Sequence, residues 1–353
     1  MDEIVKITRR RRNRPFIAGV IIVGVFYFIA VFADFLAPYD YREQTRAMPS
    51  APPSTLRFRD ADGMLRLRPF IYQQRLVDAR NVVYDEDASR GFPIELFTHG
   101  KPYSLFGLIS TDVHLFGISG SDDVPHVHLL GTDQLGRDRF SRLLFAIRFS
   151  LLVSPIGMIL ACIIGIAFGA VSGYARRTLE TIMMGIADTM ISLPTLILIL
   201  AARAAFPIEL PPIRAATLLI LIFALTGWAE IARLTRGLVV SMRQREFVLA
   251  ARATGVTETR ILFRHVMPNI SSPLLIQATL MLPVFLLAEV SLSFLGVGLQ
   301  EPEPSLGNML SLSGDLTQLA NSPFVILSPA VAIFLFVLGV RLIGWRGRSK
   351  LAA

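Results

Sequence analysis

The sequence predicts an all-α polytopic membrane protein with six transmembrane helices and a small β-rich, outward-facing insertion between the first two helices. Two observations carry this prediction: 53% of the 353 residues are hydrophobic, and the apolar residues gather in six long runs. A helix of about 20 residues crosses the ~30 Å hydrocarbon core of a bilayer. The expected spans are residues 16–36, 149–174, 182–205, 215–232, 270–299 and 323–343.

The segments around these spans complete the expected organisation. Residues 1–15 form a basic tail, and residues 37–147 form the outward insertion, which is expected to end in an amphipathic helix at the membrane interface. The helical core covers residues 148–345 and contains one long polar loop at residues 233–269. Residues 344–353 form a second tail.

The positions of lysine and arginine predict that both termini are cytoplasmic. Six basic residues precede the first span, two follow the second, seven lie between Arg233 and Arg264, and four lie between Arg341 and Lys350. The short outward connections hold only Arg203 and Arg214. The loop at residues 233–269 is therefore expected to be cytoplasmic.

The formal net charge of +8 does not indicate nucleic-acid binding. The insertion holds 13 basic and 14 acidic residues and is nearly neutral, so the excess charge lies beside the cytoplasmic ends of the spans. Basic side chains there bind anionic lipid at about 1 kcal/mol each. No metal site is expected, because His126 and His128 have no Cys, Asp or Glu partner at ligand spacing.

The insertion contains two predicted β-hairpins. Residues 56–59 and 65–68 alternate apolar and basic side chains around Asp60–Gly63, and a second pair, residues 94–97 and 103–106, flanks His99–Lys101. A small β-rich subdomain is therefore expected.

A helix is expected to begin near Leu135, capped by Thr132 or Asp133. Its apolar face would consist of Phe140, Leu143, Leu144 and Ile147. Two roles remain open for the polar side chains before it. Capping and local salt bridges, or direct contact with a substrate, would each explain Asp133, Arg137 and Asp138.

The loop between the fourth and fifth spans is the most informative segment. Helix formers follow Glu246 up to Gly255, which interrupts them, and residues 257–263 predict a second short helix that ends before Pro268. Two helices separated by a glycine and anchored in the membrane at both ends would form a rigid lever. A soluble partner could push such a lever.

This loop resembles the coupling loop of ABC-importer permeases of the dipeptide/oligopeptide(/nickel) type, through the order Glu-x-x-x-Ala-Ala-x-x-x-Gly followed by Met-Pro-Asn. Three further blocks resemble the same family: residues 128–138, 188–194 and 289–307. The first block carries the motif of the expected outer interfacial helix. Its members are Gly131, Thr132, Asp133, Gly136, Arg137 and Asp138.

The resemblance implies a permease subunit of an ATP-driven importer in a bacterial or archaeal cytoplasmic (inner) membrane. It implies four kinds of partner: a second homologous permease, two ATPase subunits, an exported solute-binding protein and membrane lipid. ATP and Mg²⁺ would be bound by the ATPases, since no G-x-x-x-x-G-K-[ST] pattern occurs in this chain. The chain would thus be no enzyme and hold no cofactor. The residues that the resemblance assigns to ATPase coupling are Glu246, Ala250, Ala251, Arg252 and Gly255.

Asp188 and Glu289 lie inside the expected third and fifth spans, where ionisable groups are costly and face protein or water. Hydrogen bonding between helices and lining of the substrate path both remain open for them. Pro194 and Pro283 are expected to kink their helices.

The resemblance implies peptides as substrates, and nickel, opines or oligosaccharides are alternatives within the same class of importer. A secondary transporter driven by an ion gradient is a less favoured alternative, because no internal repeat is evident and the long loop would have no role. An intramembrane enzyme is disfavoured, because the spans hold no histidine and Asp188 has no evident carboxylate partner.

Overall fold

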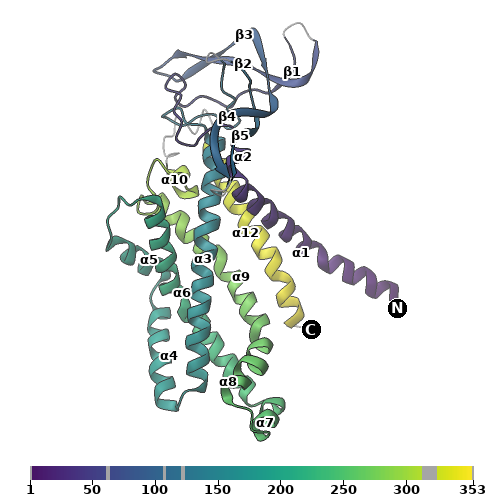
Figure 1. Ribbon diagram of the computed structural model, residues 1–353, viewed down its shortest axis with the longest axis vertical. Coiled ribbons are helices and arrows are strands. Elements are labelled where there is room, and N and C mark those ends of the chain that lie inside the picture. Colours follow the sequence, from purple (N-terminus) through teal and green to yellow (C-terminus); the bar gives the residue numbers. More distant parts are fainter. Residues whose placement is uncertain (1, 61–63, 106–108, 121–123, 312–323, 352–353) are drawn as a thin grey trace. The chain divides into compact units, whose positions relative to one another are not determined.

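The computed structural model describes residues 2–60, 64–105, 109–120, 124–311 and 324–351 (Figure 1). The chain divides into two compact units. Unit 1 holds residues 1–24, 152–292 and 335–353, and unit 2 holds residues 25–151 and 293–334.

The helices belong to spans, to their extensions or to short connections. Their bounds are α1 Asp2–Val31, α2 Ala33–Leu36, α3 Arg139–Tyr174, α4 Arg177–Ser192, α5 Thr195–Ala204, α6 Pro212–Arg243, α7 Glu246–Ala253, α8 Glu258–Ile261, the π-helical turn η1 Leu262–Val266, α9 Met267–Phe294, α10 Leu306–Ser311 and α12 Phe324–Leu351.

Within the described residues, five helical stretches are long and apolar enough to cross a membrane, or six if α4 and α5 form one bent span. Three of these stretches, Arg139–Tyr174, Pro212–Arg243 and Glu258–Phe294, are longer than the expected spans. The second span begins ten residues earlier than expected, at Arg139, and the fifth span extends back to Glu258. Residue 323, where the sixth span was expected to begin, lies outside the described residues.

The third expected span, residues 182–205, is not one straight helix. Helices α4 and α5 meet at 88° across Leu193 and Pro194. Pro194 has no N–H to donate, and proline also drives the preceding residue out of the helical region. Leu193 accordingly has an extended ψ of 136°. The kink expected at Pro194 is therefore a complete break.

Helices α3 and α6 pack closely within unit 1 because one face of α3 consists of small residues. A Cβ on Gly165 would lie 2.5 Å from the carbonyl oxygen of Trp228, and one on Gly169 would lie 2.7 Å from Cβ of Thr235. Small residues let two membrane helices approach in this way. The residues of this face recur every fourth position: Gly157, Ala161, Gly165, Gly169 and Gly173.

The described part of unit 2 contains five strands in two antiparallel sheets. Strands β1 Arg57–Arg59, β2 Leu65–Asp78 and β3 Val83–Pro93 form the first sheet in that order, and β4 Glu95–Leu105 pairs with β5 Ile109–Gly117 in the second. The first predicted hairpin is confirmed, since Arg59 pairs with Leu65, although residues 61–63 of its turn lie outside the described residues.

The second predicted hairpin is wrong. His99–Lys101 does not form a turn but lies inside the continuous strand β4, and the register slips between His99 and Tyr103. Leu105 pairs with Ile109, so this pair closes the antiparallel ladder of β4 and β5. Residues 106–108, which include Phe106 of the expected strand, lie outside the described residues. Gly100, Lys101 and Pro102 have the composition of a turn, but in the structure they form a bulge within β4.

Candidate functional site

Helix α7 occupies the segment that the sequence assigned to coupling, and it ends in a Schellman motif. The N–H of Val256 donates to the carbonyl oxygen of Ala251 at 3.1 Å, and the N–H of Gly255 donates to that of Arg252 at 3.0 Å. Gly255 has a φ of +80°. Glycine adopts this left-handed conformation at no steric cost. The predicted break between two helices at Gly255 is confirmed.

An ion pair binds the two sides of this turn together. Arg252 Nε and Nη2 donate to the two carboxylate oxygens of Glu258, at 2.6 Å and 3.0 Å. The hydrogen bond to Glu258 raises the pKa of the Arg252 guanidinium. Helices α7 and α8 are thereby fixed at a defined angle by both backbone and side-chain bonds.

The sequence prediction that the second short helix ends before Pro268 is wrong. Helix α8 continues through η1 into α9 without a break, and the N–H of Met267 bonds to the carbonyl oxygen of Leu262, five residues earlier. In a regular helix the Pro268 ring would clash with the carbonyl group of Arg264. A wider π-helical turn precedes the proline instead. The segment after Gly255 is therefore one helical body with the fifth span.

One face of the segment from α7 to α9 is buried against α6. Val248 of α7, Ile261 of α8, Val266 of η1 and Ile270 of α9 are fully buried and form one cluster with Val239 of α6. Burial of such side chains contributes about 1.5–3 kcal/mol each. The segment is thus a packed element and not a loose connector.

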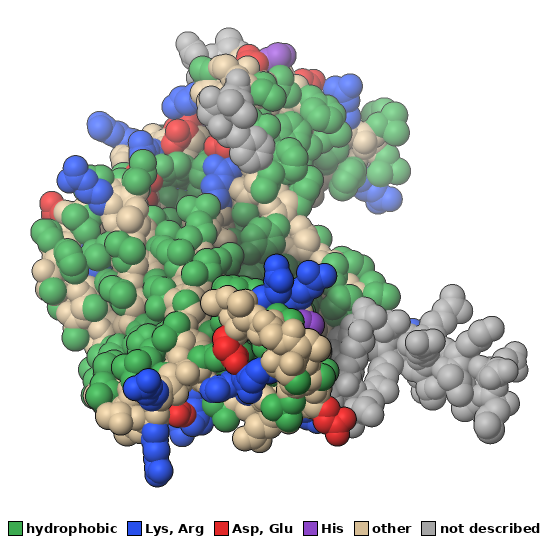
Figure 2. Space-filling model, turned by 60° about the horizontal axis from the view of Figure 1, so that its bottom comes forward, with side chains coloured by type: hydrophobic (Ala, Val, Ile, Leu, Met, Phe, Trp, Pro, Cys, Tyr) green, Lys and Arg blue, Asp and Glu red, His purple; other side chains and the backbone are tan. Residues whose placement is uncertain are grey.

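The opposite face of α7 is exposed and partly apolar. The exposed fractions of Phe247 and Leu249 are 44% and 48%. Glu246 and Ala250 are also exposed, whereas Ala251 and Arg252 are half-buried. Figure 2 views the molecule with its lower end forward, and charged side chains gather around this end. Of the five residues singled out from the sequence, Glu246, Ala250, Ala251 and Arg252 lie in α7, and Gly255 follows it. This helix is about two turns long, and its exposed surface includes Glu246, Phe247, Leu249 and Ala250.

Asp188 lies in a polar cavity between α4 and α6. Its Oδ1 pairs with Arg233 Nη1 at 3.2 Å, and both side chains are more than half exposed. About two helical turns earlier in α4, Glu180 accepts a hydrogen bond from Arg236 Nε at 2.7 Å. The cavity of about 520 Å³ is lined by both pairs. Asp188 thus links two helices and lines a cavity at the same time.

Glu289 differs from Asp188, because it is fully buried within α9. Its environment is protein and not an open cavity. This favours helix packing over lining of a path.

The sequence analysis did not single out Glu230, although it lies inside the expected fourth span. It is exposed in the middle of α6 and lines a cavity of about 240 Å³ formed by α4, α5, α6 and α9. Glu230 could have been recognised from the sequence as an acidic residue inside an expected span. The same signal identified Asp188.

The motif at residues 131–138 lies in unit 2 and forms a compact turn before α3. Asp133 Oδ1 accepts hydrogen bonds from the N–H groups of Leu135 and Arg137, both at 2.9 Å. Thr132 Oγ1 accepts from the N–H of Ala51 at 2.7 Å. Gly131 and Gly136 have φ values of +72° and +74°. The turn ties the motif to residues 45–51.

Helix α3 begins at Arg139, so the prediction of a helix start near Leu135 with Thr132 or Asp133 as its cap is wrong. Asp138 is the N-cap: its Oδ2 accepts from the N–H of Ser141 at 2.7 Å, and its Oδ1 lies 2.9 Å from His128 Nδ1. Asp133 cannot cap the helix because it closes the preceding turn. The expected interfacial helix is the first part of α3 and not a separate element.

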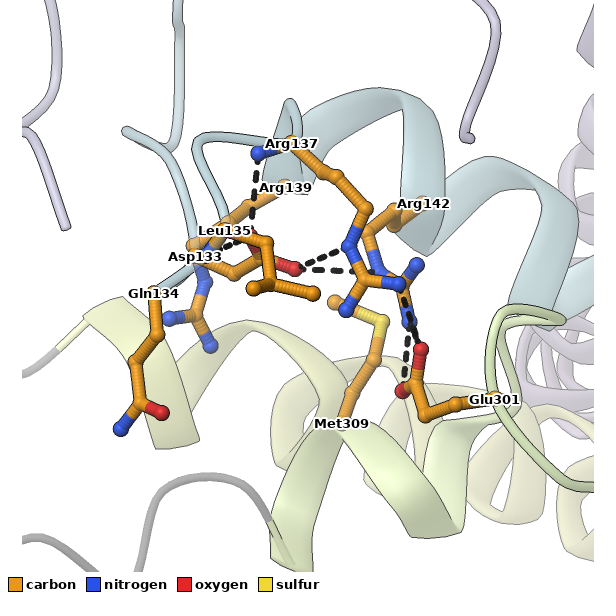
Figure 3. Close-up of a pocket in the computed structure, with 8 residues that line it drawn as sticks. All are labelled: Asp133, Gln134, Leu135, Arg137, Arg139, Arg142, Glu301 and Met309. Atoms are coloured by element: carbon orange, nitrogen blue, oxygen red, sulfur yellow. Dashed lines mark hydrogen bonds and ion pairs between the residues drawn. The ribbon is translucent and has the colours of Figure 1, made fainter. Parts of the chain in front are cut away.

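Arg137 of this motif and Arg142 of α3 converge on Glu301 (Figure 3). Arg137 donates to Glu301 Oε2 at 2.6 Å and to Asp133 Oδ2 at 2.6 Å. Arg142 donates to both oxygens of Glu301, at 2.8 Å and 3.1 Å. Capping and salt bridges therefore account for Asp133, Arg137 and Asp138. These bonds hold the residue 300 region against the start of α3 within unit 2.

Comparison with known proteins identifies similar sequences over most of the helical part. A family model described as "Binding-protein-dependent transport system inner membrane component" matches residues 165–344. A second model, "N-terminal TM domain of oligopeptide transport permease C", matches residues 7–53.

Two similar curated proteins come from bacilli. The dipeptide transport system permease protein DppC of Alkalihalophilus pseudofirmus is 37% identical over 62% of this chain and 69% of its own length. The oligopeptide transport system permease protein OppC of Bacillus subtilis is 33% identical over 62% of this chain and 68% of its own. A solved structure of the MetNI methionine ABC transporter aligns with 60% of this chain and 94% of its own at 16% identity, with a TM-score of 0.44.

Proposed function

The chain belongs to the family of binding-protein-dependent transport system inner membrane components, and from this premise we propose that it is the permease subunit of an ATP-driven peptide importer. Peptides are proposed as the substrate because similar proteins are named dipeptide and oligopeptide permeases. As a multi-pass membrane protein without a nucleotide-binding motif of its own, it would depend on separate ATPases.

The observation that carries this proposal is the exposed face of α7. Phe247 and Leu249 expose apolar surface on a helix whose other face is fully packed by Val248. An exposed apolar pair beside Glu246 fits a partner groove that is apolar at its centre and basic at its rim. We assign this partner as an ATPase subunit. Nucleotide and Mg²⁺ would be bound there and not by this chain.

The connection of α7 to the spans supports transmission of movement. Only Gln244 and Arg245 separate α6 from α7, and α8 runs through η1 into α9. Val248 and Ile270 belong to the same buried cluster. Because the segment is joined on both sides to spanning helices and packed between them, a displacement of α7 would shift α6 and α9 and not be absorbed in a flexible loop.

The remaining parts of the proposal concern topology and assembly. We propose six spans, with α4 and α5 together forming the third, and we place both termini and α7 on the cytoplasmic side because the basic residues gather there. The insertion would then face outward, where an exported binding protein delivers its ligand. A second homologous permease would complete the path beside α4, α5 and α6.

Reconstitution tests the proposal. The chain would be purified with its companion permease and ATPases, inserted into liposomes and supplied with the binding protein and radiolabelled dialanine. ATP-dependent accumulation by the assembly, and none by this subunit alone, is expected. Accumulation by the subunit alone under an ion gradient would refute the proposal and favour a secondary transporter.

A further inference from the structure

Among the residues that the structure describes, Glu230 is the one acidic side chain lining the cavity formed by α4, α5, α6 and α9. It lies in the middle third of α6 and is exposed. An ionised group at such a position in a spanning helix is costly, and it is a functional candidate by default.

Within the described residues, no basic side chain lies within ion-pair distance of Glu230. Its one hydrogen-bond partner there is the Gln277 amide, whose Nε2 lies 3.4 Å from Oε2. The neighbouring acidic groups differ in this respect. Asp188 pairs with Arg233, and Glu180 pairs with Arg236. Arg233 stands one turn from Glu230 on α6, yet its guanidinium is directed to α4.

The other lining groups suit an organic cation. Thr226 and Gln277 add polar atoms, whereas Met190, Met281 and Phe285 supply apolar and polarisable surface. The cavity opens beside the break between α4 and α5, to which Met190 and Thr195 belong. Gly227 admits Phe285 of α9, because a Cβ at that position would lie 3.1 Å from its Cε1. The cavity is therefore walled by four helices and, among the described residues, holds one negative charge without a basic partner.

We propose that Glu230, together with Gln277, binds the α-ammonium group of a peptide in transit. This inference rests on the proposed function. A carboxylate accepts a charge-assisted hydrogen bond from an ammonium group, and the Gln277 side-chain oxygen supplies a second acceptor. The charge of the substrate replaces the counterion that Asp188 and Glu180 obtain from arginines. A basic residue of the companion permease is the competing occupant.

Uptake of dialanine by the reconstituted assembly distinguishes these occupants. Glu230→Gln keeps the shape and removes the charge, and it is expected to reduce uptake at least tenfold at unchanged subunit composition. Glu230→Asp is expected to stay within threefold of the wild type. N-acetyl-dialanine has no ammonium group, so the wild type and Glu230→Gln are expected to take it up equally poorly.

A thiol-protection experiment reads the site directly. In a Cys162→Ser background, a cysteine in place of the cavity-lining Thr226 leaves Glu230 intact. Thr226→Cys is expected to react with a cationic methanethiosulfonate reagent, and dialanine is expected to slow the reaction at least threefold. Leu225→Cys is the control, because Leu225 is 62% exposed and lies roughly 140° around α6 from Glu230. Dialanine should leave its labelling unchanged.

Three results would overturn the inference while leaving the importer intact. The first is uptake of dialanine by Glu230→Gln within twofold of the wild type. The second is an equal loss of dialanine and N-acetyl-dialanine uptake in that variant. The third is loss of the companion permease when Glu230→Gln is purified, which would assign Glu230 to a subunit contact. Absence of dialanine uptake by the wild-type assembly would instead refute the proposed function, and this inference with it.

Discussion

Arg252 and Glu258 join two helices across a glycine turn through two parallel hydrogen bonds, Nε to Oε1 at 2.6 Å and Nη2 to Oε2 at 3.0 Å. Both side chains are substantially exposed, at 38% and 48%. Such exposed pairs contribute about 0.2–1 kcal/mol to stability. The pair therefore matters more for the angle between α7 and α8 than for folding.

Removal of this pair is expected to uncouple the assembly without unfolding it. Arg252→Gln should leave the thermal midpoint of the purified subunit within about 2 °C, since the pair contributes so little. It should lower the number of peptides imported per ATP hydrolysed about threefold. Measuring uptake and ATPase activity in the same liposomes checks the ratio. The exchange Arg252→Glu with Glu258→Arg should restore part of it, and an unchanged ratio in the single variant would assign the pair no role in coupling.

Substitution of Gly255 is expected to reduce transport more strongly than substitution of Arg252. Its φ of +80° costs a β-branched residue about 1 kcal/mol or more, although no other group lies within 4 Å of a Cβ placed there. Gly255→Val is therefore expected to re-aim α8 and reduce uptake at least tenfold. Gly255→Asn is the matched control, because asparagine tolerates this conformation, and it should keep at least a third of the uptake. Equal activity of the two variants would show that the turn geometry does not limit transport.

Glu246 tests the contact with the ATPase. It is exposed in the first turn of α7, where a negative charge also favours the positive end of the helix. Glu246→Lys should leave membrane insertion intact and weaken copurification of the ATPases at least fivefold. Quantifying subunits after affinity purification checks this, with Glu209→Lys, in the connection between α5 and α6, as a charge-matched control. Normal copurification and uptake in Glu246→Lys would indicate that α7 only connects α6 to α8 and does not contact the ATPase.

The packing of α3 on α6 predicts a stability effect. Gly169→Ala would place a Cβ 2.7 Å from that of Thr235 and against the backbone of Ala232, and relief of such overpacking typically costs 1–3 kcal/mol, here about 2. Gly237→Ala on α6 has open space around the new methyl group and should be neutral or slightly stabilising. Thermal denaturation followed by size-exclusion chromatography in detergent separates the two. Equal midpoints would mean that α3 and α6 are not held this closely.

Cysteine labelling tests the proposed orientation. In a Cys162→Ser background, a cysteine at the fully exposed Leu67 of β2 should react with an impermeant thiol reagent applied outside intact cells. A cysteine at the exposed Thr257, between α7 and α8, should react only after permeabilisation. The reverse pattern would place the β-strands inside the cell and exclude delivery from an exported binding protein to this face.

Local sequence signals predicted much of the secondary structure of the segment from Glu246 to Val266. Helix α7 begins at Glu246 and Gly255 interrupts it, because helix propensity and glycine conformation act within a few residues. The continuation through Pro268 could not be predicted from propensity. It depends on the packing of Ile261 and Val266 against α6, which overrides the local preference of the proline.

Hydropathy predicted which segments are long and apolar enough to span a membrane, but it did not predict the path of the backbone within them. Residues 182–205 are predominantly apolar, and a composition average does not distinguish a straight helix from an 88° break at Pro194. The same average did not reveal Glu230, because one charged residue barely changes the mean hydropathy of a long apolar segment. In the insertion, strand β4 passes through His99–Lys101 because its pairing with β5 outweighs the turn preference of a glycine.

The π-helical turn at Leu262–Val266 sets the phase of the coupling segment relative to the fifth span. Each residue of an α-helix advances the chain by about 100° around the axis. A chain with one residue fewer here, closed into a regular helix, would rotate α8 by about that amount and carry Ile261 out of its buried cluster. In the proposed assembly, the side of α7 that faces the ATPase would thus depend on a single inserted residue more than ten positions away in the chain.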